Sequence, residues 1–361
     1  MENLVEKLYK AYNGKRVLVT GHTGFKGSWL CQWLVKMNAE VYGISKDISS
    51  NPSMFEDNKI AEHLNEDIRL NVLEGDALLQ KVNEIKPHYI FHLAAQPIVS
   101  LSYKDPVDTF MNNTIGYASL LNTVRLMNDD CTVVLASSDK CYKNKEWTWG
   151  YRENDEMGGY DPYSASKATS EIVFESFFHS FFKGQDKKML SSVRAGNVIG
   201  GGDWSVDRII PDAFKAWYKN EVLYLRRPGS VRPWQFVLEP LFGYLLTAID
   251  LQEKKISNGE CFNFGPDTTQ NLTVGEMIEQ LQNISKVGTY EAAPQNATFY
   301  ETSLLRLNAD KAKTFLKWKP VINIDETLTL IANWYKEYQS NKNMFVFTEK
   351  QIEFFEKAIL A

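Results

Sequence analysis

Two short runs of polar side chains in the middle of the chain have the types needed for proton transfer. Ser138–Lys140 supplies a hydroxyl, a carboxylate and an amine, and Tyr163–Lys167 supplies a phenol four residues before a second amine. Side chains four residues apart on a helix lie on the same face. A phenol held beside a cation can exchange a proton near neutral pH. The two runs therefore indicate acid–base chemistry.

Local signals place both runs on regular elements. The apolar run Thr132–Ala136 predicts a buried strand that ends just before Ser138. Asp161 is a suitable cap for a helix opened by Tyr163, and Pro162 suits the first helical position. We therefore expect a hydroxyl at the end of a strand and a phenol at the start of the next helix.

The pKa of the phenol decides what it can do. The ordinary pKa of tyrosine is near 10, and a cation within about 4–6 Å lowers it by roughly 1–3 units. We expect Lys167 to lower the pKa of Tyr163, so that the phenolate removes a proton from a hydroxyl whose oxygen Ser138 holds in place. The alternative for Tyr163 and Lys167 is an ordinary helix pair without chemistry.

Short apolar runs alternate with helical segments over the first half of the chain. This alternation is typical of an α/β protein with a Rossmann-type, doubly wound parallel sheet. Beyond the sixth strand the pattern changes to Pro-rich turns and isolated helices, which predicts a smaller α/β C-terminal lobe. The expected strands are Arg16–Thr20, Glu40–Ile44, Ile68–Leu70, Tyr89–Leu93, Thr132–Ala136 and Met189–Arg194.

A glycine-rich loop follows the first expected strand and precedes a helix. Its spacing is Gly-x-x-Gly-x-x-Gly, and its alternative is a tight turn without a ligand. Glycines permit close backbone approach, and the helix N-terminus offers unpaired N–H groups to a pyrophosphate. The loop therefore predicts dinucleotide binding. Its candidate residues are Gly21, Thr23, Gly24, Phe25, Lys26 and Gly27.

Other strand ends should complete this site, because ligands of such sheets bind outside the carboxyl ends of the strands. In the run Ser45–Asp47, the carboxylate of Asp47 suits the ribose hydroxyls of NAD, whereas Ser45 and Lys46 would tolerate the 2′-phosphate of NADP. Asp67 and Ile68 are candidates for the adenine edge, or a simple turn into a strand. The loop after the fourth strand adds Leu93, Ala94 and Ala95.

Bulk properties narrow the class of protein. The chain has 361 residues, enough for two lobes, and a net charge of −5 without a basic stripe, which argues against a nucleic-acid partner. No apolar run approaches the roughly 20 residues needed to cross a bilayer. The four cysteines are scattered, which predicts reduced thiols, no metal site and a cytoplasmic location.

We divide the chain into a dinucleotide-binding domain, 1–195, and a substrate domain, 196–361, with a segment near 234–264 returning to the first.

Six motifs carry a resemblance over about residues 14–320. With them the chain resembles the nucleotide-sugar 4,6-dehydratases of the extended short-chain dehydrogenase/reductase superfamily, and within these the CDP-glucose branch. The resemblance implies a homodimer through a four-helix bundle that contains the Tyr163 helix, with a higher oligomer also open, and a role in deoxysugar synthesis for O-antigen or another polysaccharide. The motifs are Thr20–Leu30, His92–Pro97, Ser138–Tyr142, Gly158–Ser164, Arg194–Trp204 and Arg232–Gln235.

The resemblance also implies a reaction without net redox change. Tightly held NAD takes hydride from C4 of the glucose unit, water leaves across C5 and C6, and the hydride returns to C6. Asp139 then protonates the departing C6 oxygen, and Lys140, which stands where relatives often have Glu, removes the C5 proton. Burial should raise the pKa of Asp139 and disfavour a charged Lys140. A pair sharing one proton, or a surface salt bridge, are the alternatives.

Further residues are implied for ligand contacts. Ala195 is expected near the nicotinamide, and Arg226 and Arg227 are additional candidates for the diphosphate. Tyr300–Thr302 stands where relatives usually read His-Glu-Ala. The implied substrate contacts are Gln96, Ser138, Asn197, Arg208 and Arg232.

Two other functions remain open at this point. One is a 4,6-dehydratase or 4-epimerase for a UDP-, GDP- or dTDP-linked sugar, although an epimerase needs no acid–base pair for C6. The other is a non-catalytic NAD-binding regulator, which would be expected to lack an intact pair such as Tyr163 and Lys167.

Overall fold

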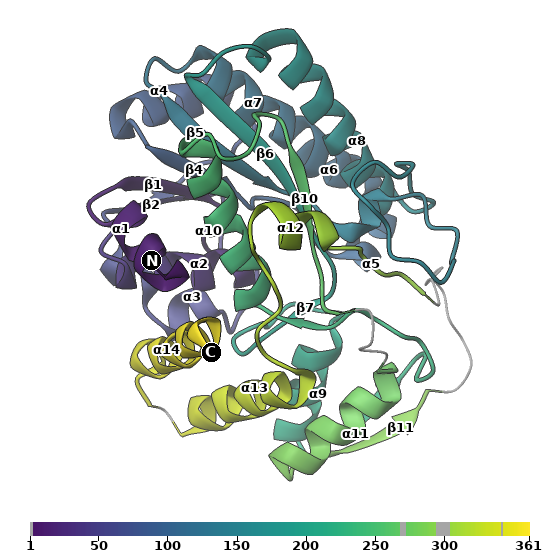
Figure 1. Ribbon diagram of the computed structural model, residues 1–361. Helices are drawn as coiled ribbons and strands as arrows, with labels where there is room; N and C mark the ends of the chain where they lie inside the picture. Colours follow the sequence, from purple (N-terminus) through teal and green to yellow (C-terminus); the bar gives the residue numbers. More distant parts are fainter. Residues whose placement is uncertain (1–2, 268–271, 294–303, 341) are drawn as a thin grey trace.

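A parallel seven-stranded sheet forms one half of the molecule (Figure 1). The computed structural model describes the chain apart from residues 1–2, 268–271, 294–303 and 341. The strand order β10-β6-β5-β4-β1-β2-β3 confirms the doubly wound Rossmann-type sheet. The chain reverses direction of winding at β1, which is where such sheets bind ligands. The strands are β1 (Arg16–Thr20), β2 (Glu40–Ser45), β3 (Glu66–Arg69), β4 (Tyr89–His92), β5 (Cys131–Ala136), β6 (Lys188–Ala195) and β10 (Cys261–Phe264).

Helices cover both faces of this sheet. On one face a buried apolar cluster that includes Leu18, Leu121 and Val133 packs under α4, α7 and α8. On the other face a larger cluster packs under α1, α2 and α10. The segments are α1 (Leu4–Tyr12), α2 (Phe25–Lys36), α3 (Met54–Asp57), η1 (Ile60–His63), α4 (Gly75–Ile85), α5 (Val99–Lys104), α6 (Pro106–Phe110), η2 (Met111–Ile115), α7 (Gly116–Leu126), η3 (Asp139–Cys141), α8 (Pro162–Phe177), η4 (Phe178–Phe182) and α10 (Leu238–Gln252).

The second half of the chain builds a lobe beside the carboxyl ends of the strands (Figure 1). Its apolar interior is continuous with the larger cluster of the sheet, and Phe214 stacks on Tyr335 with ring centroids 4.0 Å apart. Two short parallel pairs, β7 with β9 and β8 with β11, complete it. The elements are β7 (Val198–Ile199), α9 (Ile209–Tyr218), β8 (Val222–Leu225), β9 (Gln235–Phe236), α11 (Val274–Ser285), β11 (Thr289–Ala292), α12 (Asp310–Phe315) and α13 (Ile324–Gln339).

Two late segments lie against the first half of the chain. Within residues 234–264, α10 packs on β5 and β6, and β10 pairs with β6 at the edge of the sheet. The last helix, α14 (Met344–Leu360), packs on α1 and α2, and Trp33 Nε1 donates a hydrogen bond to Glu356 Oε1 at 2.9 Å. The C-terminal helix, whose packing the sequence leaves open, thus covers the N-terminal helices of its own chain.

Membrane spans and metal clusters are both absent from the described residues. None of the helices in this part of the chain is long and apolar enough to span a membrane. Likewise, across the same ranges, no group of three or more His, Cys, Asp or Glu side chains is placed to hold a metal ion.

Candidate active site

One large cavity lies at the carboxyl ends of the strands and continues into the second lobe. It encloses about 530 Å³, a size typical of small-molecule sites. The structure brings most of the predicted site residues to its wall. These are Gly21, Thr23, Gly24, Phe25, Lys26, Gly27, Leu93, Ala94, Ala95, Ser138, Asp139, Lys140, Tyr163, Lys167, Ala195, Asn197, Arg208 and Arg232.

The glycine loop is packed too closely for side chains at two positions. Gly21 has φ of +74°, and a Cβ there would lie 2.6 Å from the backbone nitrogen of Ala94. A Cβ on Gly27 would lie 2.2 Å from the carbonyl oxygen of Gly21. The backbone of α2 therefore sits directly against the turn after β1.

The start of α2 suits an anionic group. Gly24 is its N-cap and offers no side-chain oxygen to the first-turn N–H groups. Thr23 Oγ1 donates to the backbone oxygen of Asp47 at 2.7 Å, which fixes the loop against the end of β2. Ser45, Lys46 and Asp47 also line the cavity. This arrangement fits a dinucleotide, with its pyrophosphate at the helix N-terminus.

Asp67 and Ile68, the two residues predicted for the adenine edge, do not line the cavity. Asp67 instead pairs with the buried His22, at 2.7 Å between Nε2 and Oδ1, and with Arg69 at 2.9 Å. The next residues along the chain, Leu70–Val72, line the cavity in their place.

Gln96 is also absent from the cavity wall, although a substrate contact was expected. Its side-chain amide donates to Thr109 Oγ1 at 2.9 Å, and its Oε1 accepts from the backbone N–H of Ile98 at 2.5 Å. Because these partners hold the side chain within its own loop, the wall is formed by the following residues, Pro97–Ser100.

The run after β5 folds into the single turn η3. Ser138 Oγ donates to Asp139 Oδ1 at 3.0 Å and accepts from the backbone N–H of Lys140 at 3.3 Å. Asp139 is 2% exposed, and its Oδ2 has no hydrogen-bond partner in the described part of the chain. Burial raises the pKa of this carboxyl, as expected from the sequence. Lys140 is half-buried on the same wall.

The phenol and the second amine lie on the first turns of α8. Asp161 caps this helix by accepting from Ser164 N at 2.9 Å. Burial raises the pKa of Tyr163 to about 12, although a hydrogen bond with Ser138 and the charge of Arg208 oppose this. The expected lowering of this pKa by Lys167 is therefore wrong for the protein chain itself. Burial lowers the pKa of Lys167 to about 8, against the opposing charge of Glu171.

Lys26 adds a cation whose electrostatic role the sequence did not indicate. Burial, followed by repulsion from Lys167 and Arg208, lowers its pKa to about 7. Its Nζ lies 3.4 Å from Tyr244 Oη. Lys26 thus joins Lys167, Arg208 and the other basic side chains of the cavity wall, which together favour an anionic ligand.

The far end of the cavity combines arginines with carboxylates. Arg208 lies 3.7 Å from Asp203 Oδ2, and Arg226 and Arg227 join Arg232 on the wall. Asp212, on the first turn of α9, was not predicted, and burial raises its pKa to about 6. No motif signals this residue, because its place depends on how α9 meets β8. Tyr300–Thr302 lies outside the described residues.

Sequence and fold both relate the chain to known proteins. The family model for GDP-mannose 4,6 dehydratase matches residues 18–331. CDP-glucose 4,6-dehydratase of Salmonella typhimurium is 41% identical over 345 residues, 94% of this chain and 96% of the relative. An epimerase structure from Methanothermobacter thermautotrophicus has a TM-score of 0.80 at 23% identity, over 93% of this chain and 96% of that one.

A second solved structure with the same fold contains ligands. UDP-glucuronic acid 4-epimerase from Bacillus cereus, in complex with UDP-glucuronic acid and NAD, has a TM-score of 0.75 at 21% identity, over 89% of this chain and 99% of that one. At such identities the two structures support the fold alone. Because the family model and the 41% identical relative span most of the sequence, the chain belongs to the GDP-mannose 4,6 dehydratase family of nucleotide-sugar enzymes.

Proposed function

We propose that this protein converts CDP-D-glucose to CDP-4-dehydro-6-deoxy-D-glucose and water. The observation that carries the proposal is the turn η3, where the buried carboxyl of Asp139 stands next to the amine of Lys140 on the cavity wall. Such an acid–base pair has a use in removing water and none in inverting a carbon. The identity to a relative named CDP-glucose 4,6-dehydratase supports the choice of nucleotide.

NAD is the cofactor that we assign to the glycine-loop end of the cavity. When bound, it supplies a reversible hydride acceptor. The backbone around Gly21, Gly24 and Gly27 fits its pyrophosphate, and we assign the ribose hydroxyls to Asp47, which lines the cavity. The Bacillus cereus epimerase, which shares the fold, was solved in complex with NAD.

Tyr163 and Lys167 carry the proton transfer at C4 in this proposal. The phenolate of Tyr163 takes the proton of the C4 hydroxyl, while Ser138 holds that oxygen by a hydrogen bond. A pKa of about 8 leaves Lys167 mostly charged at neutral pH, so its ammonium stabilises the phenolate in a buried site. Because burial raises the pKa of Tyr163, this added positive charge is needed for the phenol to act as a base.

Asp139 and Lys140 carry the loss of water. The C5 hydrogen becomes acidic once C4 is a ketone, and the amine of Lys140 accepts this proton. The C6 oxygen leaves with the proton of Asp139, so that one water is released and a C5–C6 double bond forms. When the hydride taken from C4 returns to C6, Lys140 gives its proton back to C5, which completes the 4-dehydro-6-deoxy sugar. Burial raises the pKa of Asp139, which favours the protonated carboxyl that this step requires.

Arginines at the far end suit the diphosphate. Arg232 and Arg208 line the wall next to Asn197, and guanidinium groups bind phosphate oxygens in pairs. Arg232 also lies near enough to Asp139 to oppose the rise of its pKa. A diphosphate held there places the attached sugar at η3.

We also propose that two copies associate through α7 and α8 as a four-helix bundle. Both helices carry an exposed apolar side chain, Leu126 of α7 at 45% and Ile172 of α8 at 57%, and Phe181 of the following η4 is 48% exposed. Such side chains are unusual on the surface of a monomer when they are grouped.

We place the protein in the cytoplasm, where its free cysteines would stay reduced.

The proposal is tested by incubating the purified protein with CDP-glucose and NAD, without a reductant. Mass spectrometry should record the loss of one water, and NMR should show a ketone at C4 and a methyl group at C6. UDP-, GDP- and dTDP-glucose serve as controls. A C4 epimer as product, or faster turnover of another nucleotide sugar, would overturn the proposal.

A further inference from the structure

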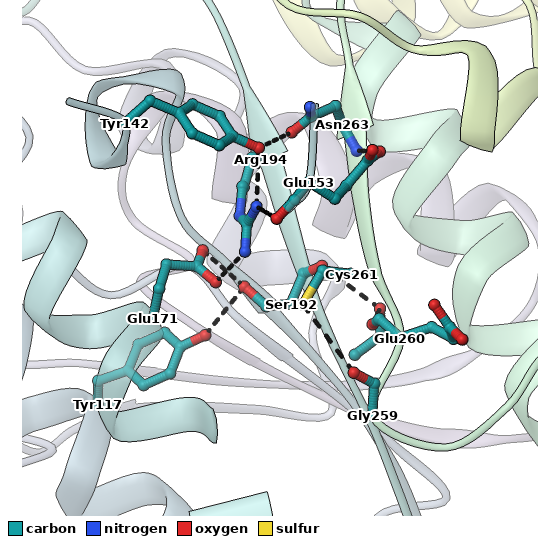
Figure 2. Close-up of polar contacts among 11 residues, drawn as sticks. Tyr117, Tyr142, Glu153, Glu171, Ser192, Arg194, Gly259, Glu260, Cys261 and Asn263 are labelled. Atoms are coloured by element: carbon teal, nitrogen blue, oxygen red, sulfur yellow. Dashed lines mark hydrogen bonds and ion pairs between the residues drawn. The ribbon is translucent and has the colours of Figure 1, made fainter. Parts of the chain in front are cut away.

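A buried polar cluster borders the cavity, whose wall includes Tyr142, and joins four elements that are distant in sequence (Figure 2). Its centre is Arg194, on β6. The cluster takes Glu171 from α8, Tyr142 from the segment just after η3, and Asn263 from β10. We call these four residues the arginine cluster. The reaction proposed above assigns no role to any of them.

One guanidinium holds two of these elements at once. Arg194 Nη2 donates to Glu171 Oε2 at 2.8 Å, and Nη1 donates to Tyr142 Oη at 2.7 Å. The side chains of Arg194 and Glu171 are 3% and 2% exposed. Burial would raise the pKa of Glu171, but the charge and hydrogen bonds of Arg194 hold it below its ordinary value. The pair is therefore fully charged, and each partner depends on the other.

Tyr142 extends the cluster to the outer strand. Its hydroxyl accepts from Arg194 and donates to Asn263 Oδ1 at 2.8 Å, and its ring stacks on Tyr151 with centroids 5.2 Å apart. Arg194 Nη1 also donates to the backbone oxygen of Glu153 at 2.9 Å. The segment after η3 is thus held in place by a charged donor (Figure 2).

The two arms of Arg194 lead to two different parts of the site. Glu171 lies one helical turn after Lys167 on α8, and Tyr142 lies two residues after Lys140. Any change in the distance between these arms changes where Asp139 and Lys140 stand relative to Tyr163. Misplacement by about 1 Å can cost on the order of 10²-fold in rate.

We propose that Arg194 and Tyr142 are positioning residues that hold the Asp139–Lys140 turn in register with Tyr163 and Lys167. This inference rests on the proposed dehydratase function. It predicts that a weakened cluster leaves C4 oxidation and substrate affinity nearly intact and slows the removal of water. A merely structural role would instead lower all steps together with stability.

The decisive comparison is Tyr142→Phe with Tyr117→Phe. Both variants remove one buried hydroxyl from the same region, because Tyr117 Oη donates to Ser192 Oγ at 3.4 Å, and Ser192 donates to Glu171. Only Tyr142 adjoins η3. Tyr142→Phe should reduce C5 hydrogen exchange with deuterated solvent, and water loss, by about tenfold or more at an unchanged KM. Tyr117→Phe should leave the ratio of oxidation to elimination unchanged.

Several results would overturn the inference. The first is an equal ratio of C4 oxidation to elimination in Tyr142→Phe and Tyr117→Phe. The second is an effect of Tyr142→Phe on KM alone. The third is a loss of activity that is explained by a lowered unfolding midpoint. Arg194→Lys keeps the charge but not the two-armed geometry, and should exceed Tyr142→Phe in effect; if it does not fold, Tyr142→Phe still decides. If the wild-type protein releases no water from CDP-glucose, the proposed function fails instead, before any variant is compared.

Discussion

The two ends of the cavity are built in opposite ways. At the dinucleotide end the backbone of the glycine loop reaches the wall, and Gly21 and Gly27 leave no room for even a methyl group. At the catalytic and substrate end the wall is made of side chains, many of them buried and held by partners elsewhere in the chain, such as Ser138 and Asp139. The first end selects its ligand by shape, and the second by charge and protonation. Substitutions at the two ends should therefore fail in different ways.

The largest effect is expected from Tyr163→Phe, at the catalytic end. Without the phenolic oxygen the C4 proton has no acceptor, so kcat should fall by about 10³-fold while dinucleotide affinity is kept. Steady-state kinetics with CDP-glucose, and calorimetry with NAD, measure the two quantities. Tyr290→Phe, on β11 and away from the cavity wall, is the matched control. Retention of a tenth of the activity by Tyr163→Phe would contradict its role.

Lys140→Ala separates the two steps at the same end. Removal of the amine should lower C5 exchange and water loss by about 10²-fold and leave C4 oxidation intact, seen as a change in nicotinamide absorbance. Lys143→Ala removes a nearby lysine that pairs with Glu156 at 2.6 Å on the surface, and should behave as wild type. Normal turnover in Lys140→Ala would refute its role as the base.

Gly27→Ala tests the dinucleotide end. Its Cβ would lie 2.2 Å from the Gly21 oxygen, so the helix must move away from the turn. Overpacking of this kind costs about 1–3 kcal/mol, which corresponds to a roughly 5- to 150-fold rise in the Kd for NAD. Gly229→Ala is the control, because its Cβ would meet nothing within 4 Å. Equal Kd values in the two variants would show that this end is not selected by shape.

Arg232→Ala tests the substrate part of the cavity, and it should change the affinity for CDP-glucose without changing the chemical steps. The loss of a charged donor to phosphate should raise KM for CDP-glucose by about tenfold and change kcat by less than about twofold. Higher ionic strength should reduce the difference from wild type. Arg152→Ala, at an arginine whose side chain is 67% exposed and pairs with Asp155, should have no effect. A fall in kcat without a change in KM would assign Arg232 to the chemistry instead.

The smallest effect concerns stability and pH. The pKa of Asp139 is raised in the folded state, so the native protein binds more protons than the unfolded chain from its ordinary value of 3.8 upward. The contribution of the Asp139 carboxyl to the free energy of unfolding is thus fully present at low pH, and it is lost as the pH rises through the raised pKa. Asp139→Asn should raise the free energy of unfolding at pH 7 by about 1 kcal/mol, with the gain vanishing toward pH 4.

Urea unfolding across pH 4–8 measures this difference. Asp186→Asn changes the same group at an exposed position, paired with Lys254, and should leave the pH profile unchanged. A constant difference between Asp139→Asn and wild type at every pH would mean that the carboxyl does not titrate in this range.

Sequence reasoning worked where local signals decide the structure. β1 has the predicted bounds, and the glycine loop and the cap of α8 follow from residues near them in the chain. It could not show where a distant partner holds a side chain away from the cavity wall. His22 is buried and holds Asp67, and Thr109 holds Gln96, and neither contact is visible from local spacing.

The pKa of Tyr163 shows a second kind of limit. The neighbouring lysine was readable from the spacing of four residues, but the depth of burial was not. Burial proved the larger influence and raised the pKa instead. The same holds for Arg194 and Glu171, whose pairing requires β6 and α8 to be placed first.

The packing of α14 on α1 and α2 bears on how the chain matures. Trp33 reaches Glu356, and Gln32 donates to the backbone oxygen of Phe345 at 2.6 Å, so the helix after the glycine loop is covered by a segment synthesised 313 residues later. A nascent chain on the ribosome must expose that apolar face until α14 has emerged. The dinucleotide-binding half is thus completed only after the second lobe has been made, which links cofactor uptake to synthesis of both lobes.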